Sequence, residues 1–85
     1  MTYIIHFTKS AKSDVDGLDT VIQKRLGKKL LQIVDFVDVR PLAKKLSGNL
    51  AETYRIRLGD YRILFDLEGN DIIILRVQHR KDVYR

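Results

Sequence analysis

The chain has 85 residues, which suffices for one small domain over residues 1–85 and leaves no room for a second hydrophobic core. Hydrophobic residues make up 45% and charged residues 32%, a balance that excludes a disordered chain and a membrane-embedded one. Sixteen lysines and arginines outweigh eleven acidic residues, and the resulting net charge of +5 favours a polyanionic partner.

The N-terminal segment predicts a strand followed by a first helix. Aromatic and β-branched residues favour a strand over Thr2–Phe7. A helix follows, with Thr8 or Ser10 as its N-cap and Gly17 at its end. The apolar residues of this helix stand at i, i+4 and i+7, the spacing of a buried stripe: Ala11, Val15 and Leu18.

A second helix is predicted from Asp19 to Val37. Gly27 inside this segment costs about 1 kcal/mol relative to alanine, and the lysines on the polar face are expected to be solvated. Pro41 breaks the helical pattern, so residues 44–49 are interpreted as a connection. The apolar residues recur every three or four positions, which places them on one helical face: Ile22, Leu26, Leu30, Ile33 and Val37.

From Thr53 onward the apolar periodicity changes to two, which predicts strands. Gly59-Asp60 and Gly69-Asn70 are typical two-residue hairpin turns, and Gly59 stands where a type II′ turn requires glycine. The last strand is predicted over Asp71–Gln78. The expected fold is therefore an α+β domain: an N-terminal strand, two helices and a three-stranded antiparallel meander, with the helices on one face of a single sheet.

Three arginines share one face of the predicted hairpin. A two-residue turn pairs Leu58 with Tyr61, so Arg57 stands directly opposite Arg62, and Arg55 lies on the same face. Like charges opposed across a ladder destabilise a sheet by roughly 0.2–1 kcal/mol. A solvated outer face is the alternative for any single arginine, but the opposed pair with a third arginine beside it favours an anion-binding site.

The C-terminal segment adds titratable and cationic side chains close to this face. Simple strand alternation puts His79 on the face of the arginines and Arg80 on the other, and a bulge or the strand end would reverse this assignment. His6 and His79 are widely separated, and there is no cysteine, so no metal site is expected. No signal peptide is visible, and we expect a cytoplasmic protein.

Three segments together resemble the RelE/ParE superfamily of type II toxin–antitoxin toxins, and specifically the RelE-like mRNA interferases. They are residues 45–48 (KLSG), 54–62 (YRIRLGDYR) and 79–84 (HRKDVY). The resemblance implies an endoribonuclease without metal or cofactor that cleaves mRNA in the ribosomal A site, in contact with rRNA. It also implies a cognate antitoxin, with a toxin that is monomeric alone and hetero-oligomeric in the complex, and no membrane association.

The resemblance also implies roles for individual residues. Arg57, Arg62 and Arg80 would bind the scissile phosphate and stabilise the charge of the transition state, and Tyr84 would orient the nucleotide or assist proton transfer. At positions 55 and 57, where a lysine could act as general base, the chain has arginines, which stay protonated. We therefore expect His79 or Tyr84 to transfer the proton. The expected RNA- and phosphate-binding residues are Arg55, Lys45 and Lys81.

Two other functions remain open from the sequence. The same superfamily includes ParE-like proteins that inhibit DNA gyrase, which usually lack the arginine and tyrosine set and tend to have His-Gly where this chain has His79-Arg80. A catalytically inactive RNA-binding domain is the third interpretation, because arginine replaces lysine at positions 55 and 57.

Overall fold

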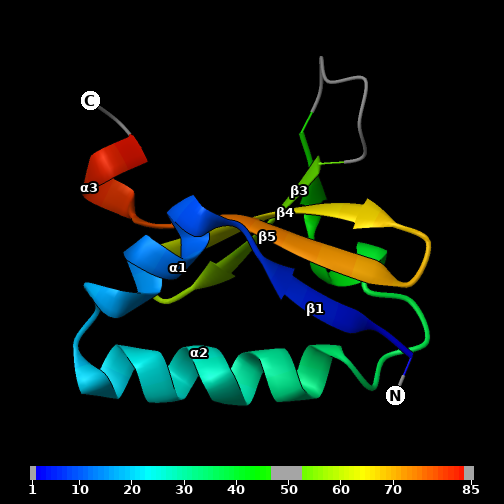
Figure 1. Cartoon of the computed structure of the whole chain (residues 1–85). Helices are drawn as coiled ribbons and strands as arrows, with labels where there is room; N and C mark the ends of the chain where they lie inside the picture. The colour runs from blue at the N-terminus through cyan, green and yellow to red at the C-terminus, as the bar shows by residue number, and fades with distance from the viewer. Residues whose placement is uncertain (1, 47–52, 84–85) are drawn as a thin grey trace.

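The computed structural model describes residues 2–46 and 53–83, which form one sheet and its covering helices (Figure 1). The sheet order is β1-β5-β4-β3-β2, with β1 parallel to β5 and the other neighbours antiparallel. The elements in chain order are β1 (Ile4–Phe7), α1 (Lys9–Asp16), α2 (Thr20–Ile33), a 3-10 turn (Arg40–Leu42), β2 (Lys44–Lys45), β3 (Thr53–Leu58), β4 (Tyr61–Glu68), β5 (Asp71–His79) and α3 (Arg80–Val83). The predicted α+β architecture is confirmed, and the two-residue strand β2, within the predicted connection, is an addition.

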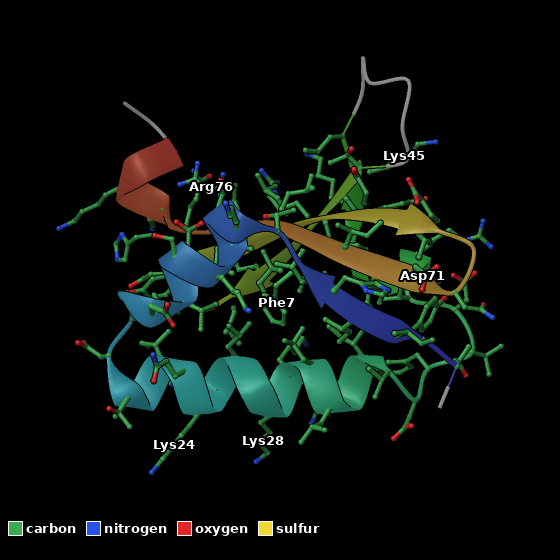
Figure 2. All side chains as sticks on the ribbon, in the orientation of Figure 1. Phe7, Lys24, Lys28, Lys45, Asp71 and Arg76 are labelled. Atoms are coloured by element: carbon green, nitrogen blue, oxygen red, sulfur yellow. The ribbon has the colours of Figure 1, made fainter. Side chains whose placement is uncertain are left out.

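The hydrophobic core lies between α2 and one face of the sheet. Alternate residues of the meander point into it, so Ile56 faces Ile63, and Tyr54 faces Phe65 with stacked rings 5.6 Å apart. From α2, Leu26 and Ile33 pack against these strands. Lys24 and Lys28 project from the side of α2 that faces away from the sheet, as predicted for a solvated face (Figure 2). We call the core side of the sheet the helix face.

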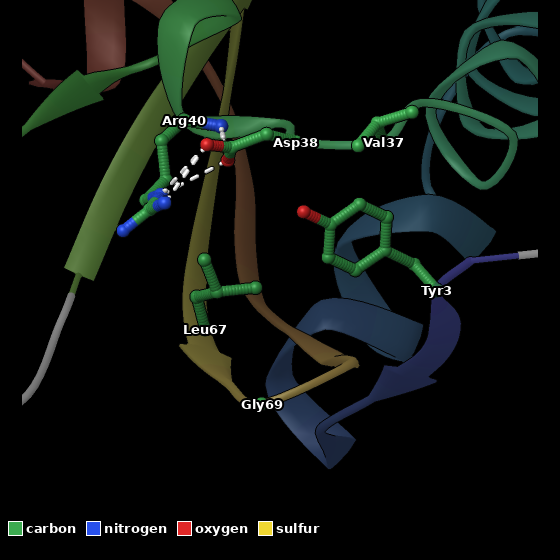
Figure 3. Close-up of a pocket in the computed structure, with 6 residues that line it drawn as sticks. All are labelled: Tyr3, Val37, Asp38, Arg40, Leu67 and Gly69. Carbon is green, nitrogen blue, oxygen red and sulfur yellow. Dashed lines mark hydrogen bonds and ion pairs between the residues drawn. The ribbon is translucent and has the colours of Figure 1, made fainter.

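Helix α2 runs without interruption through Gly27 but ends at Ile33, before the predicted Val37. The carbonyl of Val34 accepts backbone N–H groups from Thr2 and Tyr3, at 2.8 and 3.1 Å, so the chain leaves the helix to hold the N-terminal segment. Val37 is 90% exposed and lines a surface pocket of about 470 Å³, which corrects the prediction that it belongs to the apolar face of this helix (Figure 3).

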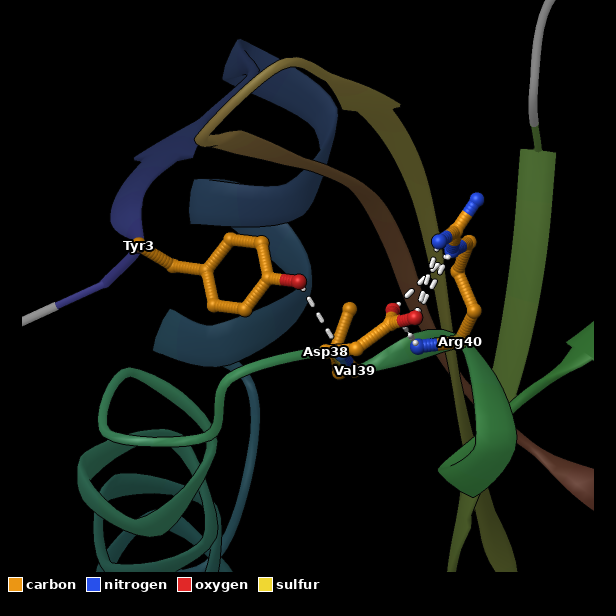
Figure 4. A network of polar contacts seen from close by, with 4 residues as sticks. All are labelled: Tyr3, Asp38, Val39 and Arg40. Carbon is orange, nitrogen blue, oxygen red and sulfur yellow. Dashed lines mark hydrogen bonds and ion pairs between the residues drawn. The ribbon is translucent and has the colours of Figure 1, made fainter.

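The segment after α2 is fastened by polar contacts. The backbone N–H of Val39 donates to the Tyr3 hydroxyl at 3.0 Å, in a buried position, and Asp38 and Arg40 form a short-range ion pair at 2.8 Å (Figure 4). On the other side of β1, at the start of α1, Thr8 is the N-cap, which was one of the two predicted alternatives. Its hydroxyl accepts the N–H of Ala11. These contacts fix the chain on either side of β1.

Both hairpin turns are as predicted. Gly59 and Gly69 have φ values of +59° and +58°, and no other residue type in the described chain has a positive φ. This combination fits a type II′ turn, in which only the first central residue needs glycine. The turn at Gly59 fixes the register of β3 against β4, and the turn at Gly69 fixes that of β4 against β5.

A β-bulge interrupts the pairing of β4 with β5. Up to Phe65, which lies opposite Ile74, the register follows from the turn, but Leu64 lies opposite Arg76 rather than Leu75. Leu75 is therefore an extra residue in β5, and every later side chain of β5 changes face. Val77, at 4% exposure, consequently enters the core.

Helix α1 covers the edge of β5 beyond the end of β1. The Asp14 carboxylate accepts the backbone N–H of Val77 at 2.9 Å and a bidentate pair of bonds from Arg76 at 2.8 and 3.2 Å. The hydroxyl of Thr8 donates to the Leu75 carbonyl at 3.0 Å. These side chains satisfy edge groups that no strand pairs. No helix among residues 2–46 and 53–83 is long and apolar enough to cross a membrane.

We predict that Asp14→Ala lowers the free energy of unfolding at pH 7 by about 1–3 kcal/mol, because two charge-assisted bonds and the strand-edge cap are lost. The hydrogen bond from Arg76, with that from the Val77 N–H, holds the pKa of the Asp14 carboxyl below its ordinary value of 3.8. This contribution is thus fully present above pH 3.8 and is lost as the pH falls through the lower, folded-state pKa. Urea titrations at pH 7 and 2.5 should show a difference between wild type and variant that shrinks at acid pH. An equal difference at both pH values contradicts the assignment.

Candidate functional site

The face of the sheet opposite the helices carries the predicted arginines. Arg57 lies directly opposite Arg62 across β3 and β4, as the sequence predicts, and Arg55 is opposite Leu64 on the same face. Lys44 of β2 lies opposite Arg55 and extends the row. We call the surface formed by Lys44, Arg55, Arg57 and Arg62 the arginine face.

The members of the arginine face differ in burial. Arg62 is only 5% exposed, Arg55 is half-buried and Arg57 is exposed. No buried side-chain nitrogen or oxygen among the described residues lacks a hydrogen-bond partner. Burial itself holds the Arg62 side chain in place. A fixed cation beside an exposed one suits the binding of an anion, because the fixed charge needs no reorganisation when the anion arrives.

The charges of this sheet face are segregated along the strands. Two acidic residues of the strands lie toward the Gly69 turn, where Asp66 accepts a bond from Thr53 at 2.5 Å and Asp71 accepts one from His6 at 3.0 Å. The arginines lie toward the Gly59 turn. The ion pairs resolved in residues 2–46 and 53–83 involve neither Arg55 nor Arg57. Asp66 and Asp71 thus stand at the far end of this face from Arg57, whereas Asp60 lies in the Gly59 turn itself.

The bulge at Leu75 decides which C-terminal side chains join the arginine face. Because of it, Gln78 lies opposite Arg62 and His79 lies opposite Tyr61. His79 is thus on the helix face, with its ring edge-on to Tyr61 at a centroid distance of 5.0 Å. Simple alternation predicts His79 on the same face as the arginines. The structure has the alternative, in which a bulge places His79 on the opposite face.

Sequence reasoning missed Arg76, Gln78 and Lys44 as members of this side of the sheet. A signal for the first two was present: strict alternation from Ile72 and Ile74 would bury Arg76 and expose Val77, which is unfavourable for both. Lys44 was missed because residues 44–49 read as a connection. Lys45, which was expected to bind RNA, lies opposite Tyr54, and its register assigns it to the other side of the strand.

The C-terminal residues lie beside the Gly59 turn. The backbone N–H of Arg80 donates to the Asp60 carbonyl at 2.7 Å, which fastens the start of α3 next to the ends of β3 and β4. Arg80 and Lys81 are exposed on this helix. Tyr84, a predicted site residue, lies outside the described residues. The part of the chain that the structure describes contains no group of three or more potential metal ligands.

Comparison with known proteins identifies the family. A sequence model of the family described as "ParE toxin of type II toxin-antitoxin system, parDE" matches residues 5–84. Toxin RelG of Mycobacterium tuberculosis is 37% identical over an aligned length of 93 residues, which covers 100% of this chain and 99% of the relative.

Solved structures give the same result. A chain of the RelB–RelE antitoxin–toxin complex from Methanococcus jannaschii is 31% identical, with a TM-score of 0.76, covering 93% of this chain and 94% of the other. A chain of the RelBE2 toxin–antitoxin complex from Mycobacterium tuberculosis is 29% identical, with a TM-score of 0.79, covering 94% and 100%. The fold is that of RelE-like toxins. The chain belongs to the RelE/ParE family of type II toxin–antitoxin toxins, as its sequence motifs indicated.

We predict that Arg57→Gln raises the free energy of unfolding by roughly 0.2–1 kcal/mol, because the variant removes like-charge repulsion from Arg62 across the ladder. The gain should shrink in 1 M NaCl, where exposed charges are screened over about 3 Å. Chemical denaturation at low and high salt measures both effects. Lys24→Gln, on the outer side of α2, is the matched control and should change stability by less. A loss of stability in Arg57→Gln at low salt would show that the arginine pair is not repulsive.

Proposed function

We propose that this toxin is an mRNA interferase, a metal-independent endoribonuclease that acts on mRNA in the ribosomal A site and so inhibits translation. The observation that carries the proposal is the opposed pair of Arg57 and Arg62 on the sheet face opposite the helices, with Arg62 buried and Arg57 exposed. Like charges opposed across a ladder repel one another, and an anionic ligand would relieve this repulsion. The relative matched over the whole chain is named Toxin RelG, and a similar solved chain comes from a RelB–RelE complex, which supports the same branch.

The proposed chemistry is an in-line displacement at phosphorus. The ribose 2′-hydroxyl attacks the adjacent phosphate, a 2′,3′-cyclic phosphate forms, and the bond to the 5′-oxygen of the next nucleotide breaks. Negative charge grows on the non-bridging oxygens in the transition state. Arg62 offers a fixed guanidinium to this charge, and Arg57 and Arg80 offer exposed ones. Arg55, Lys44 and Lys81 are proposed to contact flanking phosphates, whereas Lys45 lies on the other side of β2 and is left out of this set.

Proton transfer requires a group other than arginine, since a guanidinium does not lose its proton in proteins. We assign this role, and stacking on a nucleotide base, to Tyr84, whose phenol is suited to both. His79, the other candidate from the sequence, lies on the helix face and not with the arginines.

We also propose that an antitoxin protein binds and neutralises this toxin, with the toxin monomeric alone and hetero-oligomeric in the complex. Support comes from the similar chains of known structure, which were determined in RelB–RelE or RelBE2 antitoxin complexes. Contacts with rRNA are part of the same proposal, because an exposed row of cations suits a polyanionic surface.

Expression of the chain alone in growing bacteria tests the function. Primer extension on translated messages should show 5′ ends within codons of actively translated regions. Arg57→Gln should lower cleavage by about 10²–10³-fold, as removal of a preorganised donor to a developing anion typically does. Lys24→Gln removes the same charge from a distant helix and should cleave as wild type does.

The other outcomes of this experiment assign other functions. DNA breaks that depend on gyrase, without codon-phased cuts, would establish a ParE-like inhibitor, which the description of the matching family model makes the principal alternative. Neither cuts nor breaks, with RNA still bound, would establish an inactive RNA-binding relative. Either result contradicts the proposed nuclease.

A further inference from the structure

The side chain of His79 makes a specific contact with the helix that follows it. The backbone N–H of Lys81 donates to Nδ1 of His79 at 3.2 Å. Lys81 is the second residue of α3 (Arg80–Val83), so this bond satisfies a helix N–H that has no partner within the helix. Serine, threonine, aspartate and asparagine usually make this N-cap bond, and here a histidine ring nitrogen makes it.

The ring of His79 is held on its other sides as well. It lies edge-on to the Tyr61 ring, and both side chains line a surface pocket of about 340 Å³ with Asp14 and Val77. The backbone on each side is fixed, because His79 is paired with Tyr61 in the sheet and the Arg80 N–H is bonded to the Asp60 carbonyl. The cap therefore joins two anchored elements, the end of β5 and the start of α3.

An acceptor at Nδ1 defines the protonation state that can make the cap. A neutral imidazole with its hydrogen on Nε2 accepts at Nδ1, whereas the imidazolium ion donates from both nitrogens and accepts at neither. The titratable or charged groups around the ring are Tyr61 from β4, Asp14 from α1, and Arg80 and Lys81 from α3. Asp14 is already committed to Arg76 and the Val77 N–H, and it does not replace the cap.

We propose that His79 is a positioning residue: its neutral ring caps α3 and thereby holds the start of this helix, with Arg80, beside the Gly59 turn that joins the strands of Arg57 and Arg62, and protonation releases this helix. The expected effect on the cleavage rate rests on the proposed nuclease function, whereas the cap rests only on the contacts of His79. In this proposal, His79 positions the start of α3 and does not transfer a proton. It also gives the toxin a loss of activity at acid pH that follows the charge of one side chain.

Two isosteric variants separate positioning from proton transfer. Asparagine places its amide oxygen where Nδ1 lies and keeps the cap, whereas glutamine places its amide near the position of Nε2 and loses it. His79→Asn should retain single-turnover cleavage on programmed ribosomes within about threefold. His79→Gln should lose about tenfold, the change in rate expected if the stability of a typical N-cap bond is lost from the active geometry. The acid limb of the wild-type pH–rate profile should coincide with the NMR titration of His79 and should be absent in His79→Asn.

Equal losses in both variants would overturn the proposal in favour of proton transfer, and no loss in either would remove His79 from the site. A structural readout does not depend on cleavage. Nitrogen-15 NMR of the wild type should show the Nε2–H tautomer, and exchange of the Lys81 amide should be slow in wild type and His79→Asn but fast in His79→Gln. Equal exchange in all three overturns the cap. A wild type that shows this exchange pattern but cleaves no RNA would contradict the proposed function and not the cap.

Discussion

The extra residue at Leu75 determines the composition of both faces of the sheet at the end where the arginines lie. The two hairpin turns fix the registers of β3, β4 and the first half of β5, and the bulge then exchanges the faces of the residues that follow. Val77 enters the core and Gln78 comes to lie opposite Arg62. His79 moves to the helix face, where its ring can reach α3. The cap of α3 depends on this one irregularity.

The arginine face is a local conflict within an otherwise consistent fold. Elsewhere in the meander, the buried apolar residues point toward the helices and the turns have the glycines that they need. The opposition of Arg57 and Arg62 is unfavourable by itself, and burial of Arg62 adds a desolvation penalty. Functional sites are where such conflicts are expected, because groups arranged to meet a ligand's charge repel one another without it. The like charges of Arg57 and Arg62 therefore explain both why this pair is expected to destabilise the sheet and why it is proposed to bind an anion.

Much of the fold could be predicted from the sequence, because periodicity and turn glycines are local signals. The strand, the helices, the meander and the opposition of Arg57 and Arg62 all follow from such signals and are confirmed. The end of α2 could not be predicted, since it depends on the Val34 carbonyl bonding to Thr2 and Tyr3, which are distant in sequence. The face of His79 could not be fixed for a similar reason: the bulge is stabilised by contacts of β5 with Thr8 and Asp14 on another element. The sequence signal for the bulge was that strict alternation would have buried Arg76.

The central claim is that the arginine face binds the RNA backbone. Its most direct test is an NMR titration of the Arg guanidinium Nε–H signals with a short single-stranded RNA whose 2′-hydroxyls are methylated, so that it cannot be cleaved. We expect the signals of Arg55, Arg57 and Arg62 and the side-chain amide of Gln78 to shift together with one dissociation constant, while the amides around Lys24 and Lys28 on α2 stay unchanged. Shifts confined to α2, or none on the arginine face at saturating RNA, would contradict the account.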